Sequence, residues 1–106
     1  MDLDQLARAL DVFKTLDPDQ LPAHRIRLFL EIAVHGPITY KALEEQLVST
    51  NASVSRGVQS LSDEREDGRP GLGLVEAYKD PGEGRRFLVR LSAKGKRVLK
   101  QLEGIQ

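Results

Sequence analysis

The sequence predicts a mainly α-helical protein with a small β-hairpin, an α+β fold. Apolar side chains recur every three or four residues in five separate stretches, which is the spacing of one face of an α-helix. Two short segments, 74–79 and 86–91, instead alternate like β-strands. The segment 80–84 between them contains one proline and two glycines, which predicts a mobile hairpin tip.

The first two helices are predicted from their apolar patterns and their ends. Residues 2–16 place leucines and a phenylalanine on one stripe, and Asp17-Pro18 ends that helix. A second helix follows Leu21-Pro22 and is apolar around most of its circumference, so we expect it to be the central helix. His35-Gly36-Pro37 ends it, and we expect Gly36 to adopt the left-handed cap conformation.

The middle of the chain predicts a helix, a turn and a second helix over residues 39–63. Ile38 fits a very short strand, and Thr39 is expected to cap a helix with Leu43 and Leu47 on its inner face. Residues 48–50 are too few for anything but a tight turn. The segment 51–63 then resumes helical spacing, and 64–73 is expected to be a charged loop.

The end of the chain predicts one more helix. Ser92 is expected to cap a helix from 93 to about 103, with Val98, Leu99 and Leu102 on its apolar side. The element order is that of a winged helix-turn-helix with an additional helix at each end. We expect one domain over 1–106, with an N-terminal helix in 1–17, a winged-helix core in 21–91 and a C-terminal helix in 92–106.

Composition narrows the class of protein. The absence of cysteine excludes disulfides, thiolate catalysis and thiolate metal sites. The N-terminus lacks the pattern of a signal peptide and no stretch is long enough to span a bilayer, so we expect a cytoplasmic protein without membrane association. The net charge is zero, but residues 1–50 hold 5 Lys and Arg against 8 Asp and Glu, whereas residues 51–106 hold 11 against 8. Basic residues are therefore concentrated in the second half.

The helix expected at about 50–63 has two contrasting faces. Val54, Val58 and Leu61 predict its buried stripe. The opposite face is small, hydroxylated and amide-bearing, and it consists of Ser49, Ala52, Ser53, Arg56, Gln59, Ser60 and Asp63. Small residues let a helix enter the major groove, where Arg and Gln chelate guanine and adenine edges and hydroxyls bind phosphates. The alternative is an ordinary polar surface on which Arg56 pairs with an acid.

The start of this helix and the hairpin complete the candidate DNA-binding residues. Thr50 and Asn51 open the helix, although we expect Asn51 to project toward the core side. Lys79, Arg85 and Arg86 flank the hairpin tip, from which a wing can place an arginine in the minor groove. Solubility and protection of an edge strand are the alternative explanation for these charges.

These segments resemble the DNA-binding region of the MarR family of bacterial transcriptional regulators. The resemblance is carried by Ser-Val-Ser-Arg at 53–56, which matches the family's Ser-x-Val-Ser-Arg core, Gly-Leu-Val at 73–75, Glu83-Gly84-Arg85 in the wing, and Leu91-Ser92 with Gly95. Glutamate stands at 83 and serine at 92 where the family has aspartate and threonine. The resemblance implies that Arg85 is the wing arginine, oriented by Glu83, and that residues around Ser53 and Arg56 face the major groove.

The resemblance also bears on assembly. Members of the family dimerise through long terminal helices and bind small effectors beside them. We expect a homodimer built from the first and last helices, through Leu3, Leu6, Leu10, Phe13, Leu99 and Leu102. Effector binding is the one family property that we do not carry over, because the chain ends soon after Leu102.

Catalysis and metal binding are not expected. His24 and His35 are the only histidines and have no paired carboxylate at metal-ligand spacing, and no serine has a convincing histidine base. We therefore expect no enzyme, no metal and no cofactor. The expected function is sequence-specific binding of double-stranded DNA by a dimeric transcriptional regulator, with a recognition helix at about 50–63 in the major groove and a wing at about 79–87 in the minor groove. The alternative is a winged-helix module that binds another protein and no DNA.

Overall fold

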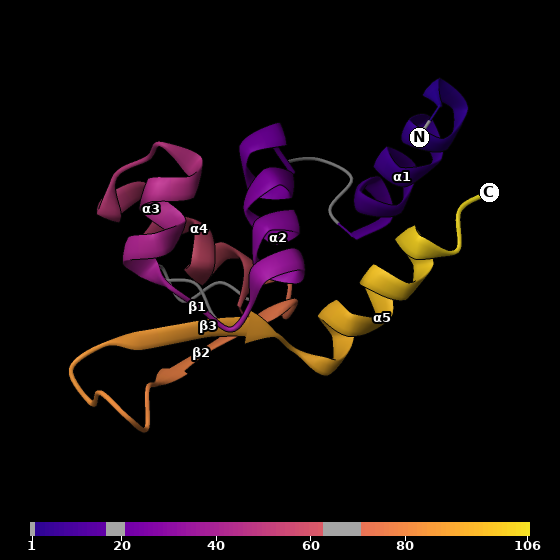
Figure 1. Ribbon diagram of the computed structural model, residues 1–106. Helices are drawn as coiled ribbons and strands as arrows, with labels where there is room; N and C mark the ends of the chain where they lie inside the picture. Colours follow the sequence, from indigo (N-terminus) through magenta and orange to yellow (C-terminus); the bar gives the residue numbers. More distant parts are fainter. Residues whose placement is uncertain (1, 17–20, 63–70) are drawn as a thin grey trace.

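A computed structural model describes residues 2–16, 21–62 and 71–106. Within these residues there are five helices and a small antiparallel sheet of three strands (Figure 1). The elements are, in order, α1 (Leu3–Leu16), α2 (Ala23–His35), β1 (Ile38–Thr39), α3 (Tyr40–Leu47), α4 (Asn51–Leu61), β2 (Val75–Lys79), β3 (Phe87–Leu91) and α5 (Ala93–Glu103). Helices α2, α3 and α4 lie on one side of the sheet (Figure 1). The element order confirms the winged helix-turn-helix that the sequence predicts.

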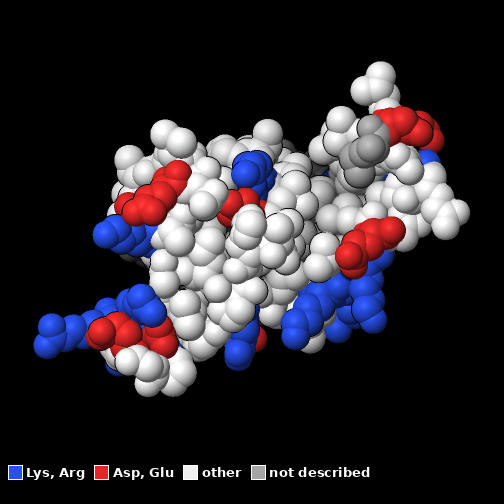
Figure 2. Space-filling view, in the orientation of Figure 1, with Lys and Arg blue, Asp and Glu red and all other residues white. Residues whose placement is uncertain are grey.

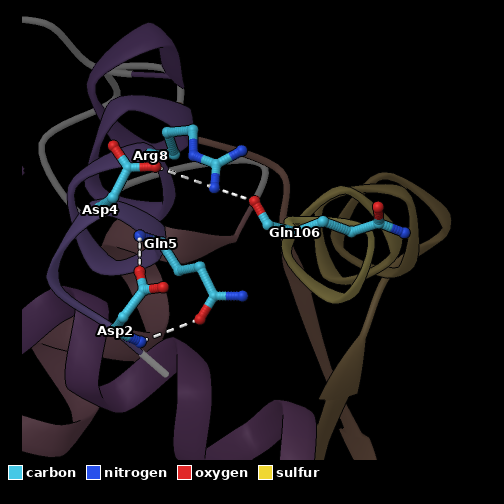
Figure 3. Close-up of polar contacts among 5 residues, drawn as sticks. All are labelled: Asp2, Asp4, Gln5, Arg8 and Gln106. Atoms are coloured by element: carbon cyan, nitrogen blue, oxygen red, sulfur yellow. Dashed lines mark hydrogen bonds and ion pairs between the residues drawn. The ribbon is translucent and has the colours of Figure 1, made fainter.

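Helix α1 is capped at its start and tied to the end of the chain. The backbone amides of Asp2 and Gln5 each donate to the other residue's side chain, over 2.9 and 2.8 Å, which satisfies two amides that a helix start leaves unpaired. Arg8 forms an ion pair with Asp4 and donates to the backbone carbonyl of Gln106 (Figure 3). The two terminal helices therefore lie together at the end of the molecule away from the hairpin (Figure 1).

Helix α2 lies at the centre, as its apolar circumference predicts. Phe29 is fully buried and meets the edge of Phe13 from α1, with ring centroids 5.6 Å apart. The remaining fully buried large side chains come from four other segments as well as α2, and they are Ile32, Leu43, Val58, Leu61, Leu74 and Val89. One core therefore joins the helices to the sheet.

The predicted left-handed conformation of Gly36 at the end of α2 is wrong. Gly36 does end the helix, and its amide donates to the carbonyl of Ile32 over 2.8 Å. Its φ of −68° and ψ of 152° are extended, however, and not left-handed. The following Pro37 is the physical reason, because proline disfavours helical backbone in the residue before it and pushes that residue toward extended conformations.

Helices α3 and α4 form the helix-turn-helix. Thr39 caps α3 by accepting from the amide of Ala42, and Thr50 caps α4 by accepting from Ser53, each over 3.1 Å. Val48 ends α3 in the left-handed conformation, with φ of 49° and ψ of 55°. The turn is therefore closed by a valine in a backbone region that favours glycine.

The sheet has the strand order β1-β3-β2, all antiparallel. Val75 pairs with Leu91 and Lys79 with Phe87, so β2 and β3 form the long hairpin of the wing. Ile38 pairs with Val89 and adds β1 at the other edge of β3. Val89 and Leu91 face the core, whereas Phe87 on the same face of the strand is about half exposed.

Helix α5 follows the wing directly, and its first turn packs closely against the backbone just before β2. The hydroxyl of Ser92 accepts from the amide of Gly95 over 3.1 Å and donates to the carbonyl of Gly73, which begins α5 at the expected residue. A Cβ on Gly95 would lie 2.0 Å from the carbonyl oxygen of Leu74. Only glycine therefore allows α5 to pack this closely on the backbone of Leu74, just before β2.

Candidate nucleic-acid interface

The two faces of α4 are separated as the sequence predicts. Val54, Val58 and Leu61 are buried, and Leu47 before the turn is partly buried. On the other face Ala52 and Arg56 are exposed, while Ser53, Gln59 and Ser60 are partly buried. Asp63, which the prediction placed on this face, lies outside the described residues. The outer face of α4 therefore carries mostly short and polar side chains, with one long cationic side chain.

Arg56 does not pair with an acid among the residues that the structure describes, nor does its side chain have a hydrogen-bond partner there. The pairing that would make it an ordinary surface residue is thus absent from the described part of the chain. Its guanidinium extends from a face whose other side chains are short. That geometry leaves it able to reach into a groove of a facing molecule.

A surface hollow of about 430 Å³ lies between the start of α4, helix α3 and the wing. Asn51, Arg85 and Arg86 line it together with Lys41 and Glu44. The helix start and the hairpin tip, which are more than thirty residues apart in sequence, therefore share one surface. Asn51 is exposed in this hollow and does not project toward the core, which corrects the expectation, because as the first residue of α4 it stands outside the packed stripe.

Tyr40 also lines this hollow from the start of α3. Its partial burial raises the pKa of its hydroxyl above the ordinary value, since burial disfavours the phenolate. The hydroxyl therefore stays protonated and able to donate a hydrogen bond across neutral and mildly basic pH. Glu44 places one carboxylate in the same hollow, opposite the arginines.

A smaller hollow, of about 120 Å³, lies on the opposite flank of α4. Ser49 and Ser53 line it from the turn and α4, and His24, Arg25 and Arg27 line it from the first turns of α2. Ser53 was predicted to contact DNA, but the three basic residues of α2 were not. Sequence spacing within one helix gives no signal that α2 and α4 share this surface.

The wing tip is organised by Asp80. Its carboxylate accepts from the amide of Gly82 over 2.8 Å and from Nε of Arg86 over 2.7 Å. The hydrogen bond from Arg86, followed by that from Gly82, lowers the pKa of Asp80 below its ordinary value. The ion pair of the wing thus joins Asp80 to Arg86, in place of the pair between Glu83 and Arg85 that the family resemblance implies.

Arg85 is left at the tip as an exposed cation. Its side chain has no ion pair or hydrogen bond within the described ranges. Lys79, at the other side of the tip, is exposed and likewise has no such partner there. Arg86 differs, because its contact with Asp80 folds it back over the turn. The three basic residues predicted at the wing therefore have two different roles in its geometry.

The stem of the wing is neutralised on its outer face. Nε of Arg90 donates to Glu76 over 2.9 Å, and the same guanidinium lies 4.2 Å above the ring of Tyr78. The hydrogen bond to Glu76 raises the pKa of Arg90, so this arginine stays charged. Figure 2 shows Lys and Arg side chains gathered at the wing and, separately, over α5. Those of α5 are Lys94, Lys96, Arg97 and Lys100.

The residues predicted for dimerisation divide into two groups. Leu3, Leu6 and Leu10 are 85%, 45% and 48% exposed, which is unusual for leucines on one helix. Phe13 is only 3% exposed and packs on Phe29, so its place in the predicted dimer surface is wrong. Leu99 and Leu102 are partly buried against the core. The face of α1 that remains available is the leucine stripe alone.

The described residues hold no second kind of site that the sequence would have allowed. No group of three His, Asp or Glu side chains among residues 2–16, 21–62 and 71–106 is arranged to hold a metal ion. His35 lies 4.0 Å from the buried carboxylate of Glu31, which also pairs with Arg27 over 3.0 Å. Across the described part of the chain, no helix combines the length and apolar character needed to cross a membrane.

Comparison with known proteins relates this geometry to solved structures. No family model and no curated protein matches the sequence. Among solved structures, MepR of S. aureus in complex with DNA has a TM-score of 0.74 at 16% identity, over 96% of this chain and 76% of MepR. A mutant MarR from E. coli complexed with operator DNA has a TM-score of 0.67 at 19% identity, over 96% of this chain and 68% of MarR.

A third similar structure is a MarR transcriptional regulator from Methanosarcina mazei Go1, with a TM-score of 0.68 and 20% identity. The match covers 97% of this chain and 70% of that protein. The likeness is therefore one of backbone over nearly the whole chain, at an identity too low to transfer residue roles. Together with the element order, the sheet register and the wing, it shows that this chain has the winged-helix fold of the MarR-type transcriptional regulators.

Proposed function

We propose that this chain binds double-stranded DNA sequence-specifically, as the DNA-binding domain of a dimeric, cytoplasmic transcriptional regulator without enzymatic activity. The observation that carries the proposal is the surface shared by α4 and the wing. Arg56 on α4 and Arg85 at the wing tip are both exposed cations without partners among the described residues. The start of α4 and the tip line one hollow. An exposed cation on a shallow helix and another on a projecting hairpin match the two grooves of a duplex.

The roles within this surface follow from side-chain chemistry. Arg56 stands among short side chains, so α4 can approach base edges closely enough for its guanidinium to reach a guanine. Ser49, Thr50, Ser53, Gln59 and Ser60 supply hydroxyl and amide groups for phosphates and bases around it. Arg85 and Lys79 would follow the adjacent minor groove and backbone. The MepR and mutant MarR structures compared above are themselves complexes with DNA, which supports the proposal.

The proposal is tested by selection from a random duplex library at about 100 mM salt, with the retained DNA sequenced. An Arg56→Ala, Arg85→Ala double variant runs in parallel. Arg97→Ala is the matched control, because Arg97 is an exposed arginine on α5, away from the wing. Enrichment of a motif by the wild type and the control, lost in the double variant, is the expected result. Retention of no DNA by the wild type contradicts the proposal and leaves the protein-binding module as the alternative.

Single variants separate the two contacts. Arg56→Ala is expected to cost about 1 to 3 kcal/mol of binding free energy and to relax the sequence preference, since it removes a base contact. Arg85→Ala is expected to weaken binding to all sequences more evenly. Equal small losses for both variants on every duplex would contradict this division of roles.

Dimerisation is proposed through the leucine stripe of α1, formed by Leu3, Leu6 and Leu10. Three exposed leucines on one helix are best covered by the same helix of a second copy. Two subunits would then read half-sites about 34 Å apart, which is one turn of the duplex. In analytical ultracentrifugation at tens of micromolar, Leu6→Glu is expected to be monomeric. Val34→Glu, at an exposed valine of α2, serves as the control and stays dimeric; a monomeric wild type removes this part of the proposal.

A further inference from the structure

Helix α4 contains a glycine at a position where the helix alone would favour another residue. Gly57 lies in the middle of α4 and is buried. Glycine there costs a helix about 1 kcal/mol relative to alanine. A Cβ built on Gly57 would lie 2.4 Å from Cδ2 of Leu28 and 2.5 Å from Nη1 of Arg25. Gly57 therefore leaves a notch in α4, and side chains of α2 fill it.

The notch opens beside the candidate DNA-binding face. Ser53 precedes Gly57 by four residues and so lies on the same flank of α4, one turn toward its start. Arg25, which is partly buried, lines the 120 Å³ hollow on this flank together with Ser53, Ser49 and His24. The guanidinium of Arg25 is thus fixed between two helices at the edge of the polar surface, on the opposite flank of α4 from the wing.

We propose that Arg25, seated in the notch of Gly57, binds a backbone phosphate of the duplex beside the major groove. The inference rests on the proposed function and adds a contact from α2 to it. An arginine guanidinium presents several donors in a fixed plane that matches phosphate oxygens. The notch holds that plane in place before DNA arrives, so little side-chain freedom is lost on binding.

The composition of the hollow supports a phosphate as its ligand. Among the residues that the structure describes, its polar lining consists of basic and hydroxyl-bearing side chains, without a carboxylate. Arg27 is paired with Glu31 over 3.0 Å, which directs its charge away along α2. With the wing on one flank of α4 and Arg25 on the other, the protein would contact the DNA backbone on both sides of the groove that α4 enters.

The test measures affinity for the selected duplex between 50 and 200 mM salt. Each phosphate contact contributes about −0.9 to the slope of log K against log salt, so over this range the affinity of Arg25→Gln is expected to fall about 3.5-fold less than that of the wild type. At 100 mM salt its affinity is expected to be about tenfold lower, with no change in sequence preference. Arg25→Lys keeps the charge and is expected to restore most of the slope.

Gly57→Ala tests whether the position of the Arg25 guanidinium matters, because the added methyl group fills the notch while every cation is kept. It is expected to weaken binding toward the level of Arg25→Gln, and thermal unfolding of each variant shows that the protein used is folded. Arg97→Gln, with one cation fewer on α5, is the control and keeps the wild-type slope. These comparisons use variants with one or no charge removed, so net charge alone does not explain a difference.

Three results overturn the inference. Arg25→Gln with a wild-type slope, while Arg85→Ala binds more weakly, would leave the proposed function standing and assign Arg25 to helix packing alone. A loss confined to one base pair would make Arg25 a base-reading residue and not a phosphate ligand. Wild-type affinity in Gly57→Ala would show that the notch does not position the guanidinium. Failure of the proposed function is distinct, since the wild type would then bind no duplex.

Discussion

Replacing Val48 with glycine is expected to stabilise the protein, although it removes the whole apolar side chain of a residue in a 106-residue chain. Val48 closes the turn between α3 and α4 with φ of 49° and ψ of 55°. In this region Cβ of an L-residue crowds the backbone, at a cost of about 1 to 2 kcal/mol, and the branched side chain of valine adds to it. Glycine has no such penalty.

The opposing contributions at this position are small. Val48 is 93% exposed, so its removal gives up only about 0.2 kcal/mol of apolar burial. The greater freedom of glycine in the unfolded chain costs about 0.4 to 1 kcal/mol. The balance is an increase of about 0.5 kcal/mol in the free energy of unfolding. That increase corresponds to about 3 °C in Tm for a domain of this size.

Urea denaturation followed by circular dichroism measures this difference directly. Val48→Gly is expected to raise the midpoint without changing the slope. Val48→Ala keeps a Cβ in the left-handed region and is expected to gain less. Val34→Gly, at a valine that is 71% exposed but helical, is expected to lose stability. A midpoint for Val48→Gly at or below that of the wild type would refute the reasoning, as would an equal gain for alanine.

Three further changes have expected outcomes in the same protein. Gly95→Ala is expected to lower the free energy of unfolding by about 2 to 3 kcal/mol, because its Cβ would meet a backbone carbonyl at 2.0 Å, whereas Gly82→Ala in the open turn changes it by less than about 0.5 kcal/mol; urea titration compares the two. Thr50→Ala is expected to cost about 1 kcal/mol by removing the cap of α4, measured in the same way, and an unchanged midpoint would contradict the capping role. The pKa of Asp80, measured by NMR titration, is expected below its ordinary value of 3.8 and to return toward it in Arg86→Gln. Because the folded pKa is the lower one, the contribution of this carboxylate to stability is present above the unfolded pKa and is lost as pH falls through the folded pKa.

The helix ends are the part of the fold that the sequence predicts best. Thr39 and Ser92 each cap a helix, as predicted, by accepting a hydrogen bond from an amide three residues later, and Thr50, which was not predicted as a cap, does the same for α4. Capping is local, so a short stretch of sequence contains all of the chemistry that decides it. Gly36 shows the limit of that reasoning, because its conformation is decided by the proline after it and not by its own freedom.

Helix α1 shows what periodicity leaves undecided. Its apolar residues cover about half of its circumference, which is wider than the surface that the core covers. The buried line passes through Ala9 and Phe13, whereas Leu3, Leu6 and Leu10 remain exposed. Spacing identifies the apolar half of the helix, but the direction in which α1 packs depends on α2 and α5, which are distant in sequence.

The residues of the candidate site also differ in how far local sequence predicts them. Arg56 and Arg85 can be predicted because each lies within a recognisable local element, a polar helix face and a hairpin tip. Arg25 cannot, because its position depends on Gly57 in another helix, thirty-two residues along the chain. The available signal is the glycine itself, since a glycine inside an otherwise regular helix indicates a close approach by another part of the molecule.

The zero net charge of the chain is compatible with DNA binding because the charges are not evenly placed. On the wing, Glu76 is matched by Arg90 and Asp80 by Arg86, which leaves Lys79 and Arg85 as cations without described partners, against the one further acid Glu83. So few surplus cations provide little long-range attraction, and one subunit would neutralise only a few phosphates. If the chain binds DNA as the proposed dimer, affinity would come from close, well-positioned contacts and from two subunits binding as a unit, since the second half-site would be bound at a high effective concentration. Under the proposed function, the leucine stripe of α1 and the arginines of α4 and the wing would therefore be parts of one binding mechanism, in which loss of the dimer would weaken binding to DNA even with every base contact intact.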